Sequence, residues 1–224
     1  IRKQLEGFLD FKAPKNAATM ANNLDWTAPV SALNFLRDIG KHFSVNQMLA
    51  KDSVSARLES GGISYTEFSY QVLQAYDFLE LFRRANCTLQ LGGSDQWGNI
   101  TAGLDLIRKV TGESAYALSV PLLTKSDGEK FGKTVTGSIW LDPTMTSPYA
   151  FYQFFINSDD RDVEKLLKIF SFKTHVEIEE LLKSLATNPG AREAHRALAQ
   201  ELTTSIHGED ACTKVEVAAK ALFG

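Results

Sequence analysis

Three polar side chains lie at helical spacing in an otherwise apolar stretch of the sequence. Tyr70, Gln74 and Asp77 occupy positions i, i+4 and i+7, which places a phenol, an amide and a carboxylate along one face of a helix. A buried polar group without a partner costs about 1–3 kcal/mol, so we expect this line to face a polar cavity. The three groups suit an ammonium or a hydroxyl group, and they predict a site for a small polar ligand. A solvated helix face is the alternative.

A glycine pair precedes a second set of polar residues in the stretch TLQLGGSDQWGNITAGLDLIRK. We predict a strand at Thr88–Leu91, a tight turn at Gly92-Gly93 and a helix that Ser94 caps. A strand that runs through glycines into a helix is how open α/β sheets build nucleotide pockets, because the glycines let the backbone approach the ligand. Asp95 lies at the N-terminus of this predicted helix, and its carboxylate suits ribose hydroxyls or an ammonium group better than a phosphate. Its alternative role is to cap the helix.

A basic segment with glycines, TKSDGEKFGKTVTG, lies between two predicted strands at residues 117–123 and 138–141. It carries Lys130, Lys133 and Thr134. We expect little to anchor this segment and therefore expect it to be mobile. Two lysines on a mobile loop can close over a polyphosphate and neutralise charge as it develops. A solvated charged loop is the alternative.

A P-loop is the rival interpretation of the same segment, and the spacing argues against it. That pattern is G-x-x-x-x-G-K-[ST], with a strand before it and a helix after it. Here three residues separate Gly128 from Gly132-Lys133-Thr134 where the pattern has four. The residues that follow, Val135-Thr136-Gly137, do not begin a good helix.

The composition is that of an ordinary globular protein, with 224 residues, 44% of them hydrophobic. A net charge of -3 excludes a strongly basic surface that coats nucleic acid. Neither the two cysteines nor the four histidines show metal-ligand spacing, so we expect no protein-bound metal and a reducing compartment. No apolar run approaches the roughly 20 residues of a membrane helix, and the first residues are not a signal peptide. We expect a cytoplasmic protein without a membrane partner, and, because an initiator Met is lacking, a piece of a longer one.

Capping signals locate the helices. Ser64 and Glu67 form a capping box, which predicts a helix that continues to about Phe82. Thr27 is a candidate N-cap for a helix over residues 29–39. From Ser147 onward the pattern is helical, so we expect two domains, a catalytic domain over residues 1–145 and an α-helical subdomain over residues 146–224. The helices predicted in the second domain span about residues 148–156, 160–170, 174–185, 191–206 and 209–222.

Five stretches of the sequence together carry a family resemblance. FSYQVLQAYDF, LQLGGSDQWGNITAG, KFGKT and TSPYAFYQFFIN, in this order and spacing, with LRDIGKHFSVNQM upstream of them, resemble the bacterial and organellar tyrosyl-tRNA synthetases of class I. Basic loops of the KMSKS type occur throughout class I. The combination of GGSDQWGN with the polar helix is characteristic of the tyrosine enzymes, and the tryptophan enzymes are the nearest alternative. The implied fold is α/β, the second half of a Rossmann-like catalytic domain followed by the helical subdomain.

The resemblance implies roles for residues around the amino acid. Tyr70 and Gln74 match positions that hold the ammonium group of tyrosine. Asp77 matches the position that bonds its phenolic hydroxyl. Gln90 and Gln96 match positions that line the amino-acid pocket.

It also implies roles around the nucleotide. Gly93 and Asp95 match the contacts to the adenosine ribose. Lys130, Lys133 and Thr134 match the loop that stabilises the leaving pyrophosphate, so these three are the implied catalytic residues, and Lys133 also binds ATP.

The implied activity is that of a tyrosine–tRNA ligase, with L-tyrosine, ATP and tRNA(Tyr) as substrates and Mg²⁺ bound to ATP. Family members are homodimers, and the apolar helices around Phe35 and Tyr65 are candidates for the dimer interface. They work in the cytoplasm or in an organelle. The sequence departs from the family because it contains no HIGH-type motif and no C-terminal RNA-binding domain. We therefore expect the isolated chain to be inactive, and a non-catalytic interaction module stays open as the alternative.

Overall fold

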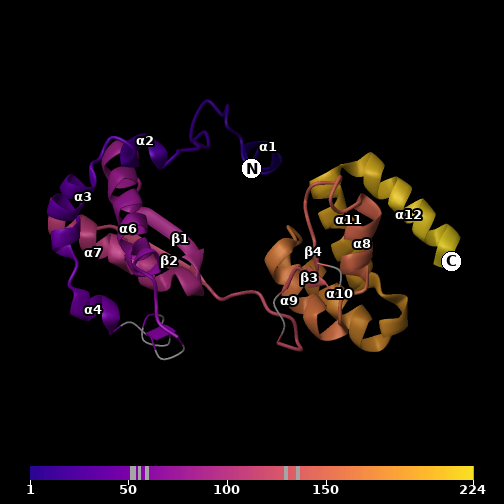
Figure 1. The fold of residues 1–224 in the computed structure, drawn as a ribbon. Helices are drawn as coiled ribbons and strands as arrows, with labels where there is room; N and C mark the ends of the chain where they lie inside the picture. Colours follow the sequence, from indigo (N-terminus) through magenta and orange to yellow (C-terminus); the bar gives the residue numbers. More distant parts are fainter. Residues whose placement is uncertain (51–53, 55–56, 59–60, 129–130, 135–136, 224) are drawn as a thin grey trace. The chain divides into compact units, whose positions relative to one another are not determined.

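The computed structural model describes all residues except 51–53, 55–56, 59–60, 129–130, 135–136 and 224. The described chain forms two compact units (Figure 1), one of residues Ala21–Leu122 and one that combines Ile1–Met20 with Leu123–Gly224. We call them the α/β unit and the helical unit and describe each by itself. The predicted domain boundary near residue 145 stays a prediction. No helix in the described ranges has the length and apolar character that crossing a bilayer requires.

The α/β unit is built around one strand–helix–strand motif and a long helix packed on it. Its two strands, β1 and β2, are parallel and in register from the pair Leu89–Tyr116 to the pair Gly93–Val120. Helix α7 connects them, as a parallel pair requires. Its elements are α2 (Leu24–Thr27), α3 (Ala32–Asp38), η1 (Gly40–His42), α4 (Val45–Leu49), α6 (Tyr65–Ala85), β1 (Leu89–Gly93), η2 (Ser94–Gln96), α7 (Trp97–Thr111) and β2 (Tyr116–Val120).

Helix α6 begins at the predicted capping box. The Ser64 hydroxyl accepts from the backbone N–H of Glu67 at 3.2 Å, and the Glu67 carboxylate accepts from the backbone N–H of Ser64 at 3.1 Å. Hydrogen bonds from Ser64 and from the Arg57 guanidinium lower the pKa of Glu67 to about 2. The helix ends three residues later than predicted, where Asn86 adopts a left-handed conformation with φ of 51°.

Helices α6 and α7 pack closely because a glycine lies at their contact. A Cβ atom on Gly103 would approach Cδ1 of Phe78 to 2.8 Å, which is too close for a real side chain. Phe78 is buried there together with Leu79 and Ile107. The core of the unit therefore includes the contact between α6 and α7, and Trp26 and Met48 from earlier helices are buried in the same cluster.

The helix predicted over residues 29–39 is shorter than expected, and its cap is different. Thr27 is not an N-cap, because it closes α2 and its hydroxyl donates to the backbone carbonyl of Asn23. The cap of α3 is Ser31, whose hydroxyl accepts from the backbone N–H of Asn34. Helix α2 ends before the predicted start, and a turn in which the backbone N–H of Val30 donates to the carbonyl of Thr27 separates it from α3.

Among its described residues, the helical unit has five longer helices and a small hairpin. Ser147 caps α8 as predicted, with Pro148 in its first turn, and Thr174 and Glu177 form the second predicted capping box. Phe155 and Leu198 belong to its buried core. Its elements are α1 (Arg2–Leu5), β3 (Lys133–Thr134), β4 (Gly137–Ser138), α8 (Pro148–Ile156), α9 (Asp160–Phe170), α10 (His175–Thr187), η3 (Pro189–Ala191), α11 (Glu193–His207) and α12 (Glu209–Phe223).

Two predicted strands are shorter than expected. Strand β2 ends at Val120 because Pro121 follows and has no backbone N–H to donate. The strand predicted over residues 138–141 is confirmed only at Ser138. Beyond it, the backbone N–H of Trp140 donates to the hydroxyl of Thr146 at 3.0 Å instead of to another strand.

Candidate functional site

The predicted polar line on α6 is present and partly open to solvent. Tyr70 is 56% exposed, and Gln74 and Asp77 are half-buried. The opposite face of the helix is buried, with Val72 and Leu79 among its core residues. The helix therefore presents a phenol, an amide and a carboxylate on the side away from the core.

Asp77 is held by two donors from the segment before α3. The indole N–H of Trp26 donates to Oδ1 at 2.8 Å, and the Asn23 amide donates to Oδ2 at 3.1 Å. Trp26 is only 5% exposed, and the Arg84 guanidinium lies over its ring at 5.7 Å. A carboxylate has about four lone-pair positions, so each oxygen keeps capacity for another donor. Asp77 is thus an oriented acceptor that can still bind a hydroxyl group.

Asn23 and Trp26 were not predicted as part of the site. A signal for Trp26 was present, because a buried indole N–H usually finds a hydrogen-bond partner. Nothing in the local sequence pairs it with a carboxylate 51 positions away. This part of the site depends on tertiary packing.

The glycine pair has a different role from the predicted tight turn. Both glycines belong to β1, and Gly93 is extended, with φ of −67° and ψ of 159°. Ser94 is not an N-cap but the first residue of the η2 turn. A Cβ atom on Gly92 would lie 3.0 Å from Cδ1 of Ile100, and one on Gly93 would lie 2.6 Å from Oδ1 of Asp95. A side chain at either position would therefore displace the side chain of Ile100 or of Asp95.

Asp95 and Gln96 form a bonded pair at the start of α7. Asp95 is exposed, Gln96 is half-buried, and the Gln96 amide donates from Nε2 to Oδ2 of Asp95 at 3.1 Å. The Asn99 side chain donates from Nδ2 to Oε1 of Gln96 at 3.2 Å. Asp95, predicted for the ribose, and Gln96, predicted for the amino-acid pocket, are thus joined to the helix by side-chain hydrogen bonds.

Gln90 lies on β1 and carries an unsatisfied acceptor. Its Oε1 atom is buried and has no hydrogen-bond partner among the described residues. Buried polar atoms are nearly always paired. A ligand donor is one group that would satisfy this oxygen.

The residues predicted for the amino acid and the ribose all lie in the α/β unit. They come from α6, from β1 and from the η2 turn at the start of α7, and α6 packs on α7. No hydrogen bond joins the polar line on α6 to Asp95 or Gln96 in the described part of the chain. The structure therefore brings the two sets onto neighbouring elements as separate groups.

The basic segment forms a hairpin. Strands β3 and β4 pair antiparallel, with Lys133 opposite Ser138 and Thr134 opposite Gly137. Lys130 lies outside the described residues, and Lys133 and Thr134 are described by their backbone. A strand instead of a helix follows Gly132, so the P-loop interpretation is excluded as predicted.

The expectation that little anchors this segment is wrong for its described residues. The backbone N–H and the hydroxyl of Ser126 both donate to Oδ2 of Asp162, at 3.1 and 3.2 Å. The Phe131 ring packs in the helical core, with its centroid 5.5 Å from that of Phe154 and 5.7 Å from that of Phe170. The hairpin is therefore fixed to α8 and α9 on both sides of Lys130.

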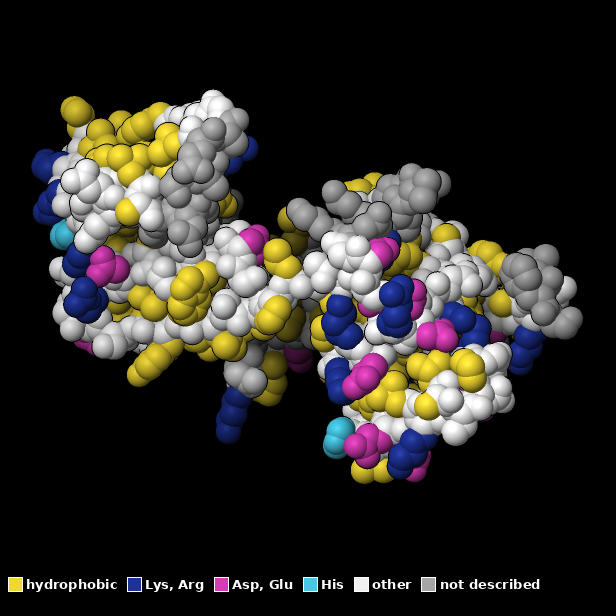
Figure 2. Space-filling model, turned by 90° about the horizontal axis from the view of Figure 1, so that it is seen from below, with side chains coloured by type: hydrophobic (Ala, Val, Ile, Leu, Met, Phe, Trp, Pro, Cys, Tyr) yellow, Lys and Arg dark blue, Asp and Glu magenta, His cyan; other side chains and the backbone are white. Residues whose placement is uncertain are grey.

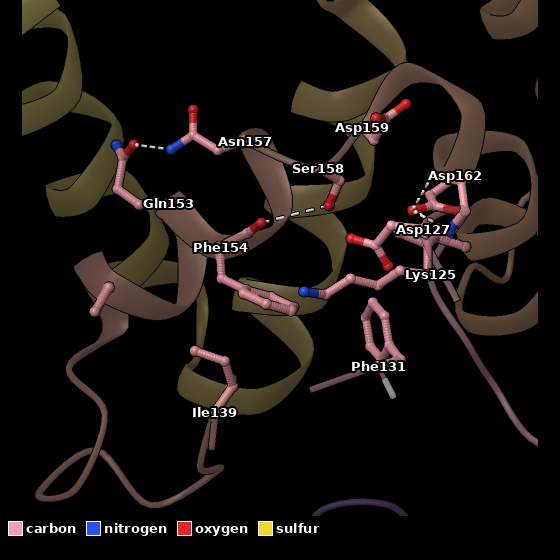
Figure 3. A pocket seen from close by; sticks show the side chains of 13 residues that line it. Lys125, Asp127, Phe131, Ile139, Gln153, Phe154, Asn157, Ser158, Asp159 and Asp162 are labelled. Carbon is pink, nitrogen blue, oxygen red and sulfur yellow. Dashed lines mark hydrogen bonds between the residues drawn. The ribbon is translucent and has the colours of Figure 1, made fainter. Parts of the chain in front are cut away.

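A cavity of about 570 Å³ lies beside this hairpin within the helical unit (Figure 3). Figure 3 shows Phe131 near Lys125, and Asp159 near the start of α9. Hydrogen bonds from the Arg161 guanidinium and backbone hold the pKa of Asp159 well below its usual range. Among the described side chains, those of the predicted site residues do not line this cavity, whereas Lys125, Asp127 and Phe131 of the basic segment do.

Comparisons with known proteins agree with this arrangement of elements. The family model for tRNA synthetases of class I, described as "W and Y", matches residues 1–224. The chain belongs to this family. In this class I family, the chain is 63% identical over 226 residues to the tyrosine–tRNA ligase of Streptomyces griseus and 58% identical over 224 residues to tyrosine–tRNA ligase 1 of Bacillus cereus. Each alignment covers 100% of this chain and 53% of the relative, so the chain spans about half the length of these curated relatives.

Solved class I synthetase structures share the fold. A C-terminally truncated mitochondrial tyrosyl-tRNA synthetase from Coccidioides posadasii aligns with a TM-score of 0.79 at 32% identity, covering 97% of this chain and 66% of its own. The corresponding protein from Aspergillus nidulans aligns with a TM-score of 0.80 at 33% identity, covering 93% and 61%. The mixed helix–strand architecture with a small parallel sheet is therefore that of the class I family.

Proposed function

We propose that this chain is part of a tyrosine–tRNA ligase, which joins L-tyrosine to ATP as tyrosyl-adenylate and then transfers tyrosine to the 3′ end of tRNA(Tyr). The observation that carries the proposal is the oriented Asp77 carboxylate on the same helix face as Tyr70 and Gln74. A carboxylate with free acceptor capacity suits a phenolic O–H. The high identity to proteins named tyrosine–tRNA ligase supports the same choice over tryptophan.

In this proposal the amino acid lies along α6. Asp77 accepts the phenolic hydroxyl, while Tyr70 and Gln74 bind the ammonium group. Gln90 and Gln96 line the pocket, and the buried, unpaired Oε1 of Gln90 is consistent with a ligand donor. Phenylalanine would leave Asp77 without that donor, so the site discriminates against it.

The nucleotide lies at the end of β1. Gly93 lets the ribose approach the backbone, and Asp95 accepts from its hydroxyls. Lys130, Lys133 and Thr134 come from the basic hairpin and act on the β- and γ-phosphates, with Lys133 also binding ATP. Mg²⁺ would arrive with ATP and neutralise phosphate charge, and a site for a protein-bound metal is not part of the proposal.

The proposed reaction needs no protein nucleophile. The tyrosine carboxylate oxygen attacks the α-phosphorus of ATP, and the bond from that phosphorus to the bridging oxygen breaks to release pyrophosphate. A hydroxyl of the terminal adenosine of tRNA then attacks the tyrosyl carbonyl and displaces AMP. Catalysis consists of positioning and of stabilising negative charge on the phosphates.

We also infer that the α/β unit is the second half of a Rossmann-like domain and that the helical unit contains its helical subdomain. One face of the β1–β2 sheet supports this, because Leu89, Leu91, Tyr116, Leu118 and Val120 all point away from α7 and are exposed. Figure 2 shows hydrophobic side chains exposed on this unit, at the left. A larger sheet in the longer protein would cover such a face.

A homodimer is part of the same proposal. Leu33 and Leu36 on α3 and Tyr65 at the start of α6 are large, exposed side chains. All three lie on the helices around Phe35 and Tyr65 that are the candidates for the interface. Sedimentation of a Leu36→Asp variant should show a lower mass than the unchanged protein, and an unchanged mass would contradict this interface. The cytoplasm or an organelle remains the predicted location.

The experiment that tests the proposed function is ATP–pyrophosphate exchange. It is measured with tyrosine, phenylalanine and tryptophan in turn, on this chain and on a form extended to the length of its relatives. Tyrosine-dependent exchange by the extended form alone is the expected result. Exchange with tryptophan would favour the tryptophan-specific relative, and no exchange with any of the three would favour a non-catalytic interaction module.

A further inference from the structure

A chain of two side-chain hydrogen bonds runs from the first turn of α7 to Asp95. Asn99 donates from Nδ2 to Oε1 of Gln96 at 3.2 Å, and Gln96 donates from Nε2 to Oδ2 of Asp95 at 3.1 Å. Asn99 and Gln96 are half-buried, whereas Asp95 is exposed. The three residues therefore form one relay that starts inside the unit and ends at its surface.

The side chains of Asp95 and Asn99, at the two ends of the relay, determine which way the Gln96 amide between them points. A carboxylate only accepts hydrogen bonds, so Gln96 must turn its NH₂ group toward Asp95 and its carbonyl oxygen toward residue 99. That oxygen then needs a donor, which the Asn99 amide supplies. If residue 99 were also an acceptor, the NH₂ group of Gln96 could turn toward Asp95 or toward residue 99, but not toward both.

We propose that Asn99 is a positioning residue that fixes the direction of the Gln96 amide and, through it, the Asp95 carboxylate. Asp95 Oδ1 lies directly beside Gly93, in space that a Cβ atom on residue 93 would enter, since such an atom would come within 2.6 Å of it. Gln96 keeps a second Nε2 hydrogen, which can donate to a ligand. The inference rests on the proposed function, since it assumes that Asp95 and Gln96 contact the substrates.

Two substitutions of Asn99 separate this role from a structural one. Asn99→Asp keeps the shape but places an acceptor where Gln96 needs a donor. Asn99→Ala removes the donor without opposing the amide. Residue 99 is the third residue of α7, where a negative charge stabilises the helix, so a purely structural role predicts that Asn99→Asp is tolerated better than Asn99→Ala.

The positioning role predicts the opposite order in activity. In ATP–pyrophosphate exchange by the extended protein, we expect kcat/KM for ATP to fall about 10- to 100-fold in Asn99→Asp and about 3- to 10-fold in Asn99→Ala. The thermal midpoint of Asn99→Asp should equal or exceed that of Asn99→Ala. Equal losses of activity in the two variants, or a smaller loss in Asn99→Asp, would overturn the inference.

A second measurement needs no activity and uses this chain. With ¹⁵N-labelled glutamine, the Gln96 Nε2 hydrogens should show nuclear Overhauser effects to the β-hydrogens of Asp95 in the unchanged chain. In Asn99→Asp these effects should move to residue 99, because the amide turns round. Effects to Asp95 that persist in the variant would overturn the inference. If the unchanged extended protein shows no tyrosine-dependent exchange, the result counts against the proposed function. The spectra would still decide the role of Asn99 in that case.

Discussion

The polar line on α6 and the basic hairpin of the helical unit hold their proposed functional groups in different ways. Asp77 sits on a helix of 21 residues and is fixed at the carboxylate itself by the donors Trp26 and Asn23. Lys133 sits on a strand of two residues, and the anchors of its segment are Ser126 and Phe131. The first region fixes the functional group itself, and the second fixes only the stretch of chain that precedes it.

This difference leads us to assign different tasks to the two regions. A group held rigidly in place can distinguish substrates by one hydrogen bond, because a misplaced partner cannot be accommodated. A cationic group on an anchored hairpin can stabilise negative charge as it develops on a phosphate. Substitutions in the α6 region should therefore change which amino acid is used, and substitutions in the hairpin should change the rate.

The largest expected effect is in the hairpin. Lys133→Ala should slow adenylate formation about 10²- to 10³-fold, because a cation that stabilises the leaving pyrophosphate is lost. Binding of tyrosine should change much less. Single-turnover kinetics and equilibrium tyrosine binding, measured on the extended protein, check this, with Lys168→Ala as the control because that lysine pairs with Glu164 on the exposed side of α9. Equal losses in rate and tyrosine binding would remove the distinction between the two regions.

The next effect concerns selectivity. Asp77→Ala should narrow the preference for tyrosine over phenylalanine, because the acceptor for the phenolic hydroxyl disappears. The size of that preference, about 10⁵, is the known value for tyrosyl-tRNA synthetases themselves and is adopted, not predicted. The ratio of kcat/KM for the two amino acids in pyrophosphate exchange measures it, with Asp105→Asn on α7 as the control. Unchanged discrimination would mean that another residue receives the hydroxyl.

A smaller effect on kcat/KM should follow when Asp77 is kept but loses one of the two donors that orient its carboxylate. Trp26→Phe removes the indole N–H that donates to Oδ1 of Asp77. We expect kcat/KM for tyrosine to fall about 5- to 30-fold, while that for phenylalanine stays constant. Trp140→Phe is the matched control, because Trp140 lies in the helical unit and is half exposed. Equal losses for both amino acids would show that Trp26 supports the fold and does not orient Asp77.

The smallest effect concerns the stability of the helical unit. His195 is fully buried, and its Nε2 lies 3.1 Å from the Asp160 carboxylate and 3.1 Å from the Ser158 carbonyl, with Arg192 nearby. Burial and the Arg192 charge lower the pKa of His195 although Asp160 opposes them. Burial also lowers the pKa of His207. Both imidazoles are therefore neutral in the folded protein at a pH where the unfolded chain begins to bind protons.

The sign of the resulting pH dependence follows from proton binding. Below pH about 6.5 the unfolded state binds more protons than the folded state, so the free energy of unfolding decreases as the pH falls. His195→Gln should make this decrease less steep between pH 7 and pH 5, with His207 responsible for part of the remaining slope. Urea unfolding at several pH values measures the slopes. An identical slope in the variant would contradict the assignment to His195.

Local signals predicted the local parts of the structure. The capping box of Ser64 and Glu67, the Ser147 cap and the spacing of Tyr70, Gln74 and Asp77 all follow from patterns within a few residues, and the structure confirms them. Such patterns act through neighbouring backbone groups, which the sequence places directly.

The features that the sequence did not predict depend on contacts between distant residues. The donors Asn23 and Trp26 reach Asp77 only after α2 packs on α6. The glycines of β1 leave room for the side chains of Ile100 and Asp95, where a tight turn had been predicted. The anchor of the basic segment depends on Asp162, 36 positions from Ser126. No local pattern encodes these pairings.

The measurement that tests the central claim most directly is the charging of tRNA by the extended protein. Labelled tyrosine and labelled tryptophan are supplied separately with transcripts of tRNA(Tyr) and tRNA(Trp). We predict that tyrosine alone is attached, and to tRNA(Tyr) alone. Attachment of tryptophan, or no attachment of either amino acid by a protein that is folded and binds ATP, would contradict the claim.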